Sequence, residues 1–290
     1  MLQECIEGLN IQPSGKYVDV TFGGGGHSKA IFNELKEGQL FAFDQDKDAE
    51  QNAWEAENFE FINENFAHLK RFLMLHNGVP VNGILADLGV SSFQIDEPIK
   101  GFSYRFDAPL DMRMSKNLRY TAADIINNYT EKKLLDLFTY YGEIRNSKTL
   151  ASHIVQTRLG RRIETTTDLV NVVKPVIKGN PPRYLSQLFQ SLRIEVNKEI
   201  EALQDLLVQA LDVLDVGGRL VVMSYHSLED RLVKNFMKYG TFGREPIKDE
   251  KGQFTLPFKL ITKKPVMASE AEVERNPRAR SARLRIAEKV

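Results

Sequence analysis

The segment Tyr17 to His27, YVDVTFGGGGH, places four consecutive glycines between an apolar run and a polar stretch. An apolar, β-branched run bounded by glycine predicts a buried strand. The residues that follow carry Ala30, Ile31 and Leu35 at helical spacing. Glycine allows a tight turn and a close approach of the backbone to a ligand, and the free N–H groups of a starting helix attract negative charge. The segment therefore predicts a strand, a ligand-binding turn and a helix, with an anionic group on the ligand.

A second apolar run, Gln39 to Asp44, ends in a carboxylate about 20 residues beyond the glycines. At that spacing in a doubly wound fold, an acid reaches a ribose hydroxyl. The glycine turn and Asp44 together predict a cofactor that contains a nucleoside. They do not decide whether this cofactor is a nicotinamide dinucleotide or S-adenosylmethionine.

Strand and helix patterns alternate over the first hundred residues, which predicts an α/β fold with a parallel, doubly wound sheet. The expected strands are residues 17–22, 39–44, 59–66 and 82–89, and the expected helices between them are residues 27–36, 47–57 and 67–77. A further strand and helix are expected at 219–226 and 228–240, before two extended stretches at 258–266 and 281–289. The last stretch has no room for a helical crossover, so we expect it to form an antiparallel edge of the sheet.

Residues from about 101 to 199 carry helix-start signals, such as Thr121 in TAAD and Thr130 in TEKK, but no convincing strand pattern. The expected helices are residues 122–128, 131–140, 147–159 and 167–177, with one or two more over 184–214. We therefore expect a sheet domain in two parts, residues 1–102 and 201–290, interrupted by a helical insert over residues 103–200.

The composition excludes several classes of protein. Lys and Arg together number 39, as do Asp and Glu, so the chain has no global basic field. Cys5 is the only cysteine, which excludes an internal disulfide and a cysteine-based metal site and fits a reducing compartment. No apolar run approaches the ~20 residues that span a bilayer, and the histidines show no metal-ligand spacing. We expect a cytoplasmic protein that binds neither membrane nor metal.

Two further polar side chains follow expected strands. Asp87 closes the strand over 82–89, and His226 follows the strand over 219–226. Both therefore lie at the carboxyl edge of the sheet, where doubly wound folds bind ligands; capping of a helix is the alternative role of Asp87. The irregular stretch over residues 89–114 is rich in Ser, Asp, Arg and aromatic residues, which predicts an active-site wall.

Five stretches resemble, in order and at compatible separations, one family, the bacterial 16S ribosomal RNA cytosine-N4 methyltransferases known as RsmH or MraW. They are TFGGGGHS, DLGVSSFQID, GFSYRFDAPLDMRM, SYHSLEDRLVK and NPRARSARLRIAEK. The departures are modest: Lys100 replaces the usual arginine, and Tyr104 and Tyr225 stand where the family often has phenylalanine. The chain also begins close to the glycine turn, without the short His-x-Pro segment that members usually carry.

The resemblance implies a class I methyltransferase domain that uses S-adenosylmethionine, with an antiparallel last strand and an inserted all-helical domain that helps to hold RNA. It also implies a set of cofactor-binding residues. Gly25, Gly26 and His27 would line the methionine end, Asp44 the ribose hydroxyls and Phe66 the adenine, and Asp87 and Gln94 would complete the pocket.

The resemblance further implies methylation of the N4 amine of a decoding-centre cytosine. The lone pair of this nitrogen is delocalised into the ring, so the enzyme must hold the amine in line and accept one of its hydrogens. We expect Asp87 and the SYHS segment with His226 to supply the acceptors, and Asp111 with Arg113 to shape the wall.

The expected partner is 16S rRNA, within the small ribosomal subunit, and the oligomeric state stays open. A pocket reaches the amine of an unstacked base only, so basic side chains near the opening would contact phosphates. The candidates for these contacts are Arg105, Arg145, Arg183, Arg193, Arg231, Arg278 and Arg280. The alternatives are a nicotinamide-dependent oxidoreductase, which shares the glycine turn and Asp44, and a non-catalytic RNA-binding assembly factor.

Overall fold

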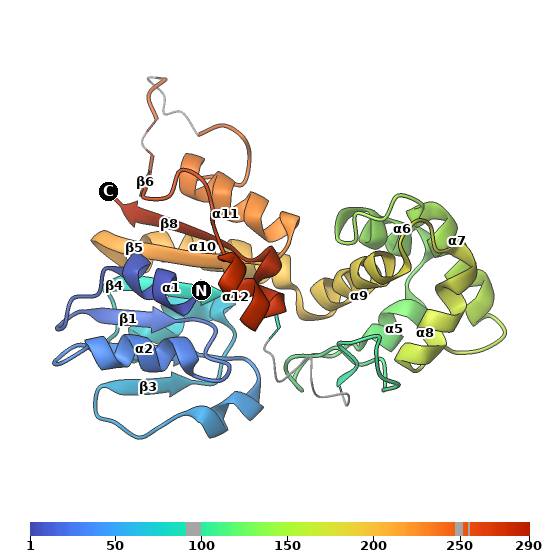
Figure 1. The fold of residues 1–290 in the computed structure, drawn as a ribbon, viewed down its shortest axis with the longest axis horizontal. Coiled ribbons are helices and arrows are strands. Elements are labelled where there is room, and N and C mark those ends of the chain that lie inside the picture. Colours follow the sequence, from blue (N-terminus) through green and yellow to red (C-terminus); the bar gives the residue numbers. More distant parts are fainter. Residues whose placement is uncertain (91–99, 247–251, 255) are drawn as a thin grey trace. The chain divides into compact units, whose positions relative to one another are not determined.

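The computed structural model describes residues 1–90, 100–246, 252–254 and 256–290. The chain divides into two units (Figure 1). Unit 1 comprises Met1–Gly89 and Ile200–Val290, and unit 2 comprises Val90–Glu199. The first boundary therefore lies nearer the sheet than the expected position after residue 102.

Unit 1 is built on an eight-stranded sheet with the order β3-β2-β1-β4-β5-β8-β6, and β7 pairs with β8. The strands are β1 Lys16–Asp19, β2 Gln39–Phe43, β3 Phe59–Ile62, β4 Val81–Asp87, β5 Leu214–Ser224, β6 Phe258–Leu260, β7 Val266–Met267 and β8 Arg283–Lys289. Strands β1 to β5 run parallel, and β8 runs antiparallel to its neighbours. This order confirms the predicted α/β class with an antiparallel last strand. The expected position of that strand at the edge was wrong, because β6 and β7 pair with its outer side.

Helices cover both faces of this sheet (Figure 1). They are α1 Leu2–Leu9, α2 Gly26–Glu34, α3 Leu69–Leu75, α10 Glu199–Val213 and α11 Ser227–Tyr239, and the short helix α12 Glu270–Arg275 follows near the C-terminus. Side chains alternate along β4: Ile84 and Ala86 pack in the cluster that contains α3, α10 and α11, whereas Leu85 packs in the cluster of α1 and α2. This period of two makes three layers, helices–sheet–helices, and buries both faces.

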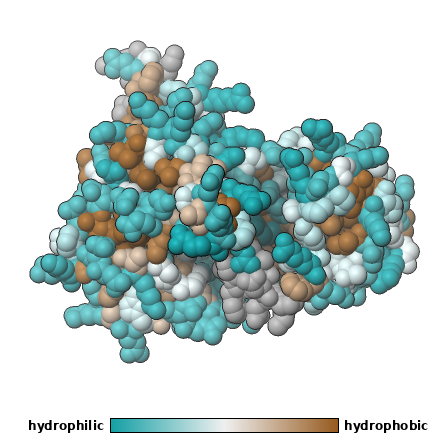
Figure 2. Space-filling model, in the orientation of Figure 1, coloured by the Kyte–Doolittle hydropathy of each residue, from teal (hydrophilic) through white to brown (hydrophobic). Residues whose placement is uncertain are grey.

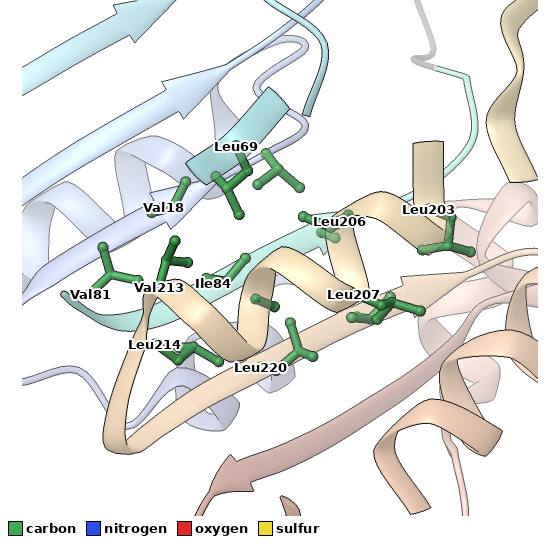
Figure 3. Packing of buried hydrophobic residues seen from close by; sticks show 14 of the residues in the cluster. Val18, Leu69, Val81, Ile84, Leu203, Leu206, Leu207, Val213, Leu214 and Leu220 are labelled. Carbon is green, nitrogen blue, oxygen red and sulfur yellow. The ribbon is translucent and has the colours of Figure 1, made fainter. Parts of the chain in front are cut away.

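Helix α10 holds β4 and β5 together. Figure 3 shows Leu206 and Leu207 of α10 over Ile84 of β4 and Leu220 of β5. All four side chains are fully or almost fully buried, and each such side chain contributes roughly 1.5–3 kcal/mol to folding. The packing fixes the strand end at Asp87, where the candidate site begins.

Unit 2 is helical in its described part. Its helices are α5 Ala122–Asn128, α6 Glu131–Tyr140, α7 Ser147–Arg158, α8 Thr166–Val173 and α9 Pro181–Asn197, with a 3-10 turn, η4 Lys174–Val176, after α8. Capping boxes start α5 at Thr121 and α8 at Thr165, as TAAD predicted for the first of them. Lys198, with φ 52°, separates α9 from α10, so the stretch expected to be helical over 184–214 forms two helices, and Leu214 already begins β5.

Three local expectations were wrong or incomplete. Residues 47–57 form only the 3-10 turn η1 Lys47–Asn52, because Trp54 leaves the helical path and stacks on Phe59 with ring centroids 3.9 Å apart. The strand expected over 59–66 ends at Ile62. The last residue of that range, Phe66, instead begins the 3-10 turn η2 Phe66–His68. Helices α1 and α12 were not expected.

Hydrophilic residues are spread over the visible face of each unit, and apolar residues form separate patches among them (Figure 2). Such scattered apolar residues are normal on a folded protein. Of the helices in the described ranges, none combines the length and the apolar character needed to cross a membrane.

Candidate active site

The glycine turn lies where β1 ends and α2 begins. Gly23 and Gly25 have φ angles of 50° and 74°, in the left-handed region that favours glycine. A Cβ atom at Gly25 would meet the Phe22 ring at 3.2 Å, whereas a Cβ at Gly24 or Gly26 would meet nothing within 4 Å. The turn therefore has open space beside Gly24 and Gly26, as a loop that admits a ligand requires.

Asp44 lies directly after β2 and is tied to this turn. Its Oδ2 accepts a hydrogen bond from the Gly23 amide over 2.8 Å, and its Oδ1 accepts one from the Asp46 amide over 2.8 Å. Burial raises the pKa of the Asp44 carboxyl to about 6, although these two amides act in the opposite direction. The carboxylate is thus preorganised at the position where the sequence placed a ribose-binding acid.

A buried network joins the ends of β1 and β4. Asp19 accepts hydrogen bonds from Thr21 and from the Ser28 hydroxyl of α2, the latter over 2.7 Å. The Asp87 amide donates to Thr21 Oγ1 over 2.7 Å. The glycine turn and Asp87 are therefore held by one set of contacts.

A cavity of about 230 Å³ opens beside Asp87. The residues that line it are Met1, Leu2, Gly26, His27, Asp87, Met223, Tyr225, Asn276, Ala279 and Ala282. Tyr225 donates a hydrogen bond to Asp87 Oδ1 over 2.8 Å, and His27 Nδ1 lies 3.7 Å from Asp87 Oδ2. Burial raises the pKa of the Asp87 carboxyl, against the lowering effect of His27 and Tyr225. Burial also raises the pKa of the Tyr225 hydroxyl, which therefore stays protonated.

The remaining expected cofactor residues lie at the other side of the turn or outside the described residues. Phe66 follows β3 at the start of η2, half-buried against the core. It shares the carboxyl edge of the sheet with Asp44, because β2 and β3 are parallel. Gln94 lies outside the described residues.

His226 and Asp111 have structural partners. His226 is the N-cap of α11, with Nδ1 3.4 Å from the Glu229 amide and Nε2 3.0 Å from Glu229 Oε1, and it does not line the cavity. Asp111, in unit 2, forms a two-pronged pair with Arg113 over 2.7 and 2.8 Å. Neither geometry tests a catalytic role.

The structure changes the role expected of one residue and adds others to the site. Tyr225 belongs to the SYHS segment that was expected to supply acceptors, but the structure shows that its hydroxyl donates to Asp87. Asn276, Ala279 and Ala282 reach the cavity from the end of α12 and the 3-10 turn η5 Pro277–Ser281. Their spacing of three residues in NPRARSA is the corresponding signal.

Comparisons with known proteins identify the family of the chain. The family model described as "MraW methylase family" matches residues 1–290. "Ribosomal RNA small subunit methyltransferase H" of Flavobacterium psychrophilum is 55% identical over 291 residues, which cover 100% of both chains. The proteins of that name from Cytophaga hutchinsonii and Azobacteroides pseudotrichonymphae are 53% and 50% identical, over 100% of this chain and 98% and 96% of theirs. The chain therefore belongs to the MraW methylase family and is an S-adenosylmethionine-dependent methyltransferase.

Proposed function

We propose that the chain methylates the N4 amine of a decoding-centre cytosine in 16S rRNA, on the small ribosomal subunit and in the cytoplasm. The observation that carries the proposal is the Asp87 carboxylate, which lines a cavity directly beside the open glycine turn. The full-length relatives named as small-subunit rRNA methyltransferases support the choice of RNA. Membership of a methylase family argues against the oxidoreductase alternative.

The residues at the sheet edge fit S-adenosylmethionine. The space beside Gly24 and Gly26 would be filled by a Cβ atom and is free for a ligand. His27 Nε2 is buried and has no hydrogen-bond partner among the described residues, so a ligand group satisfies it. We assign Gly25, Gly26 and His27 to the methionine end of the cofactor.

The ribose and adenine of the cofactor would bind on the side of the glycine turn that faces Asp44 and Phe66. Asp44 Oδ1 and Oδ2 each accept one backbone hydrogen bond, and a carboxylate oxygen has capacity for a second donor. We assign Asp44 to the ribose hydroxyls and Phe66 to the adenine face, and Gln94 remains part of this assignment. When bound, the cofactor supplies a methyl group activated by a positively charged sulfur.

Asp87 serves as the acceptor for the amine. A cytosine N4 amine is a weak nucleophile, so its hydrogens must be held by acceptors that fix the nitrogen in place. Asp87 Oδ1 is occupied by Tyr225, which leaves Oδ2 to accept an amine hydrogen and then its proton. The raised pKa of Asp87 suits this transfer, because a carboxylate with a higher proton affinity is the better base.

For His226 and Asp111 we propose roles in positioning the chain around the site. His226 fixes the start of α11 through Glu229 and thereby the main chain at Tyr225. Asp111 orders its own loop in unit 2 through Arg113, whose Nη1 also donates to the Leu118 carbonyl over 3.0 Å.

Unit 2 is proposed to hold the RNA. Between Asp168 and Glu195 the chain carries four cations and no acid: Lys174, Lys178, Arg183 and Arg193. Arg193 pairs with Glu199 over 2.7 Å, which removes it from the candidate phosphate contacts. The other three are exposed, and no ion pair involves them in the described part of the chain. Exposed, unpaired cations fit a polyanionic partner.

The test is transfer of a labelled methyl group to small subunits that lack the modification, followed by digestion to nucleosides. N4-methylated cytidine is the expected product. A ring-methylated or ribose-methylated product would contradict the N4 assignment. Cofactor binding without transfer to any ribosomal particle would favour the assembly factor.

A further inference from the structure

The Asp87 carboxylate is contacted from two separate elements. Tyr225, directly after β5, donates its hydroxyl to Oδ1 over 2.8 Å. His27, in the first turn of α2, places Nδ1 3.7 Å from Oδ2. All three side chains line the same cavity, so whatever enters the cavity meets a carboxylate that is already oriented.

Tyr225 is itself firmly held. Its amide donates to Glu229 Oε2 over 2.9 Å, and Glu229 belongs to the first turn of α11. Its hydroxyl keeps its proton because burial raises its pKa. The hydroxyl is therefore a donor, and it holds one oxygen of the Asp87 carboxylate.

His27 faces both the acid and the open part of the turn. Its Nδ1 lies 3.7 Å from Asp87 Oδ2, beyond hydrogen-bond distance, whereas Nε2 is buried without a partner in the described residues. A donor hydrogen on Nδ1 leaves Nε2 as an acceptor. The ring therefore offers Nε2 to a ligand group while it lies beside Asp87.

The other ionisable groups around Asp87 come from β1 and α1. Asp19 opposes the charge of Asp87, and the Met1 amine supports it. Cys5 of α1 is buried with a raised pKa, so it adds no charge. The Met1 amine pairs with Glu272 over 2.6 Å. Tyr225 is thus the neutral hydrogen-bond donor to the Asp87 carboxylate.

We propose that Tyr225 is a positioning residue, which fixes the Asp87 carboxylate through Oδ1, leaves Oδ2 free, and sets the pH range in which Asp87 accepts a hydrogen bond. The proposal rests on the methyltransferase function proposed above. It assigns to Tyr225 a role that a phenylalanine at this position lacks, since the hydroxyl makes the hydrogen bond to Asp87.

The test is the Tyr225→Phe variant, which keeps the ring and removes the hydroxyl. Loss of a donor to the carboxylate raises the pKa of Asp87. The acidic limb of the pH profile of methyl transfer should move to higher pH by roughly one unit, and the rate should recover at alkaline pH. A variant with merely disturbed packing would lose the same factor at every pH. A profile that superimposes on that of the wild type overturns the proposal.

Two controls sharpen this result. Tyr17→Phe removes another buried hydroxyl of unit 1, which accepts a hydrogen bond from the Gln12 amide over 2.7 Å, and should leave the pH profile unchanged. In an Asp87→Asn background, where S-adenosylhomocysteine affinity is measured against pH instead of transfer, Tyr225→Phe should cause no further shift, because the titrating group is gone. A shift in that background would assign the effect to another group and overturn the proposal.

A second readout separates this proposal from the proposed function. Affinity for S-adenosylhomocysteine is measured against pH without any RNA. If the wild type transfers no methyl group to rRNA but Tyr225→Phe moves the pH dependence of binding, the rRNA assignment fails and the positioning role stands. If transfer occurs and neither profile moves, the positioning role fails alone.

Discussion

The Gly23 amide donates a hydrogen bond to Asp44 Oδ2 over 2.8 Å and so ties the turn after β1 to the end of β2. The donor belongs to the turn that we assign to the methionine end, and the acceptor belongs to the acid that we assign to the ribose. Two ends of the ligand site are therefore coupled through a single contact.

The first prediction concerns the pH dependence of cofactor binding at Asp44. Because burial raises the pKa of this carboxyl to about 6, affinity for S-adenosylhomocysteine should fall as the pH drops through that value and the carboxylate takes a proton. Calorimetric titration between pH 5 and pH 8 measures this. Asp44→Asn should bind weakly with no such inflection, and Asp205→Asn, at an exposed position, should behave as the wild type. An unchanged inflection in Asp44→Asn would contradict the assignment.

The raised pKa of Asp44 also affects the stability of the folded protein. The folded protein holds the Asp44 proton more tightly than the unfolded chain does, since its pKa is raised from 3.8. Ionised Asp44 therefore costs stability, and that cost grows as the pH rises from about 4 through 6. A bound ribose would offset it.

The second prediction uses the open space beside the glycines. Gly24→Ala and Gly26→Ala place a methyl group where nothing lies within 4 Å. The free energy of unfolding should therefore change by less than about 1 kcal/mol. Affinity for S-adenosylhomocysteine should fall at least tenfold, because the methyl group occupies space that the ligand needs. A tenfold loss corresponds to roughly 1.4 kcal/mol of binding free energy. The control is Gly243→Ala, whose Cβ would meet Thr241 at an ordinary 3.6 Å. Wild-type affinity in both variants would place the ligand elsewhere.

Much of the fold followed from local pattern. The apolar runs before the glycines and before Asp44 and Asp87 formed the parallel strands β1, β2 and β4, because a buried strand needs apolar side chains on both faces. Thr121 capped its helix as expected. In each case the signal lay within a few residues of the element that it specified.

The parts that could not be predicted depend on contacts distant in sequence. Trp54 sits in a helical pattern, but stacking on Phe59 outweighs that local preference. The position of β8 between β5 and the short strands β6 and β7 depends on pairing that no local pattern encodes. The direction of the Tyr225 hydroxyl toward Asp87 emerges only once β4 and β5 are neighbours.

The third prediction separates stability from activity at Asp87. Burial raises the pKa of this carboxyl, so the ionised form destabilises the folded protein as the pH rises above the ordinary value for aspartate. Asp87→Asn removes the charge and keeps an acceptor for Tyr225. We expect a higher unfolding temperature than the wild type at pH 8, a smaller difference at pH 5, and loss of methyl transfer. A variant that is less stable at pH 8 but still transfers methyl groups would contradict both parts.

The fourth prediction concerns the cations of unit 2. Asn146, at the start of α7, donates to the Val176 carbonyl over 2.8 Å, which brings the exposed Arg145 and Lys148 of that helix start towards the segment that carries Lys174 and Lys178. Cations that contact phosphates release bound counterions, so RNA affinity depends on salt with a slope of roughly 0.7 to 0.9 per contact. Lys174→Glu with Lys178→Glu should weaken RNA binding and flatten this slope by between one and two units, while affinity for S-adenosylhomocysteine stays unchanged. Filter binding at several salt concentrations measures the RNA affinity and its salt slope.

The matched control for this pair reverses two cations of unit 2 that already have acidic partners. Lys132 lies 3.9 Å from Asp136, and Arg162 lies 3.6 Å from Glu164. Lys132→Glu with Arg162→Glu changes the net charge of the chain by the same amount as the test pair. If RNA recognition were a matter of total charge, both pairs would weaken binding equally. We expect the slope to change for Lys174 and Lys178 alone, because an unpartnered cation has no competing carboxylate and is free to neutralise a phosphate.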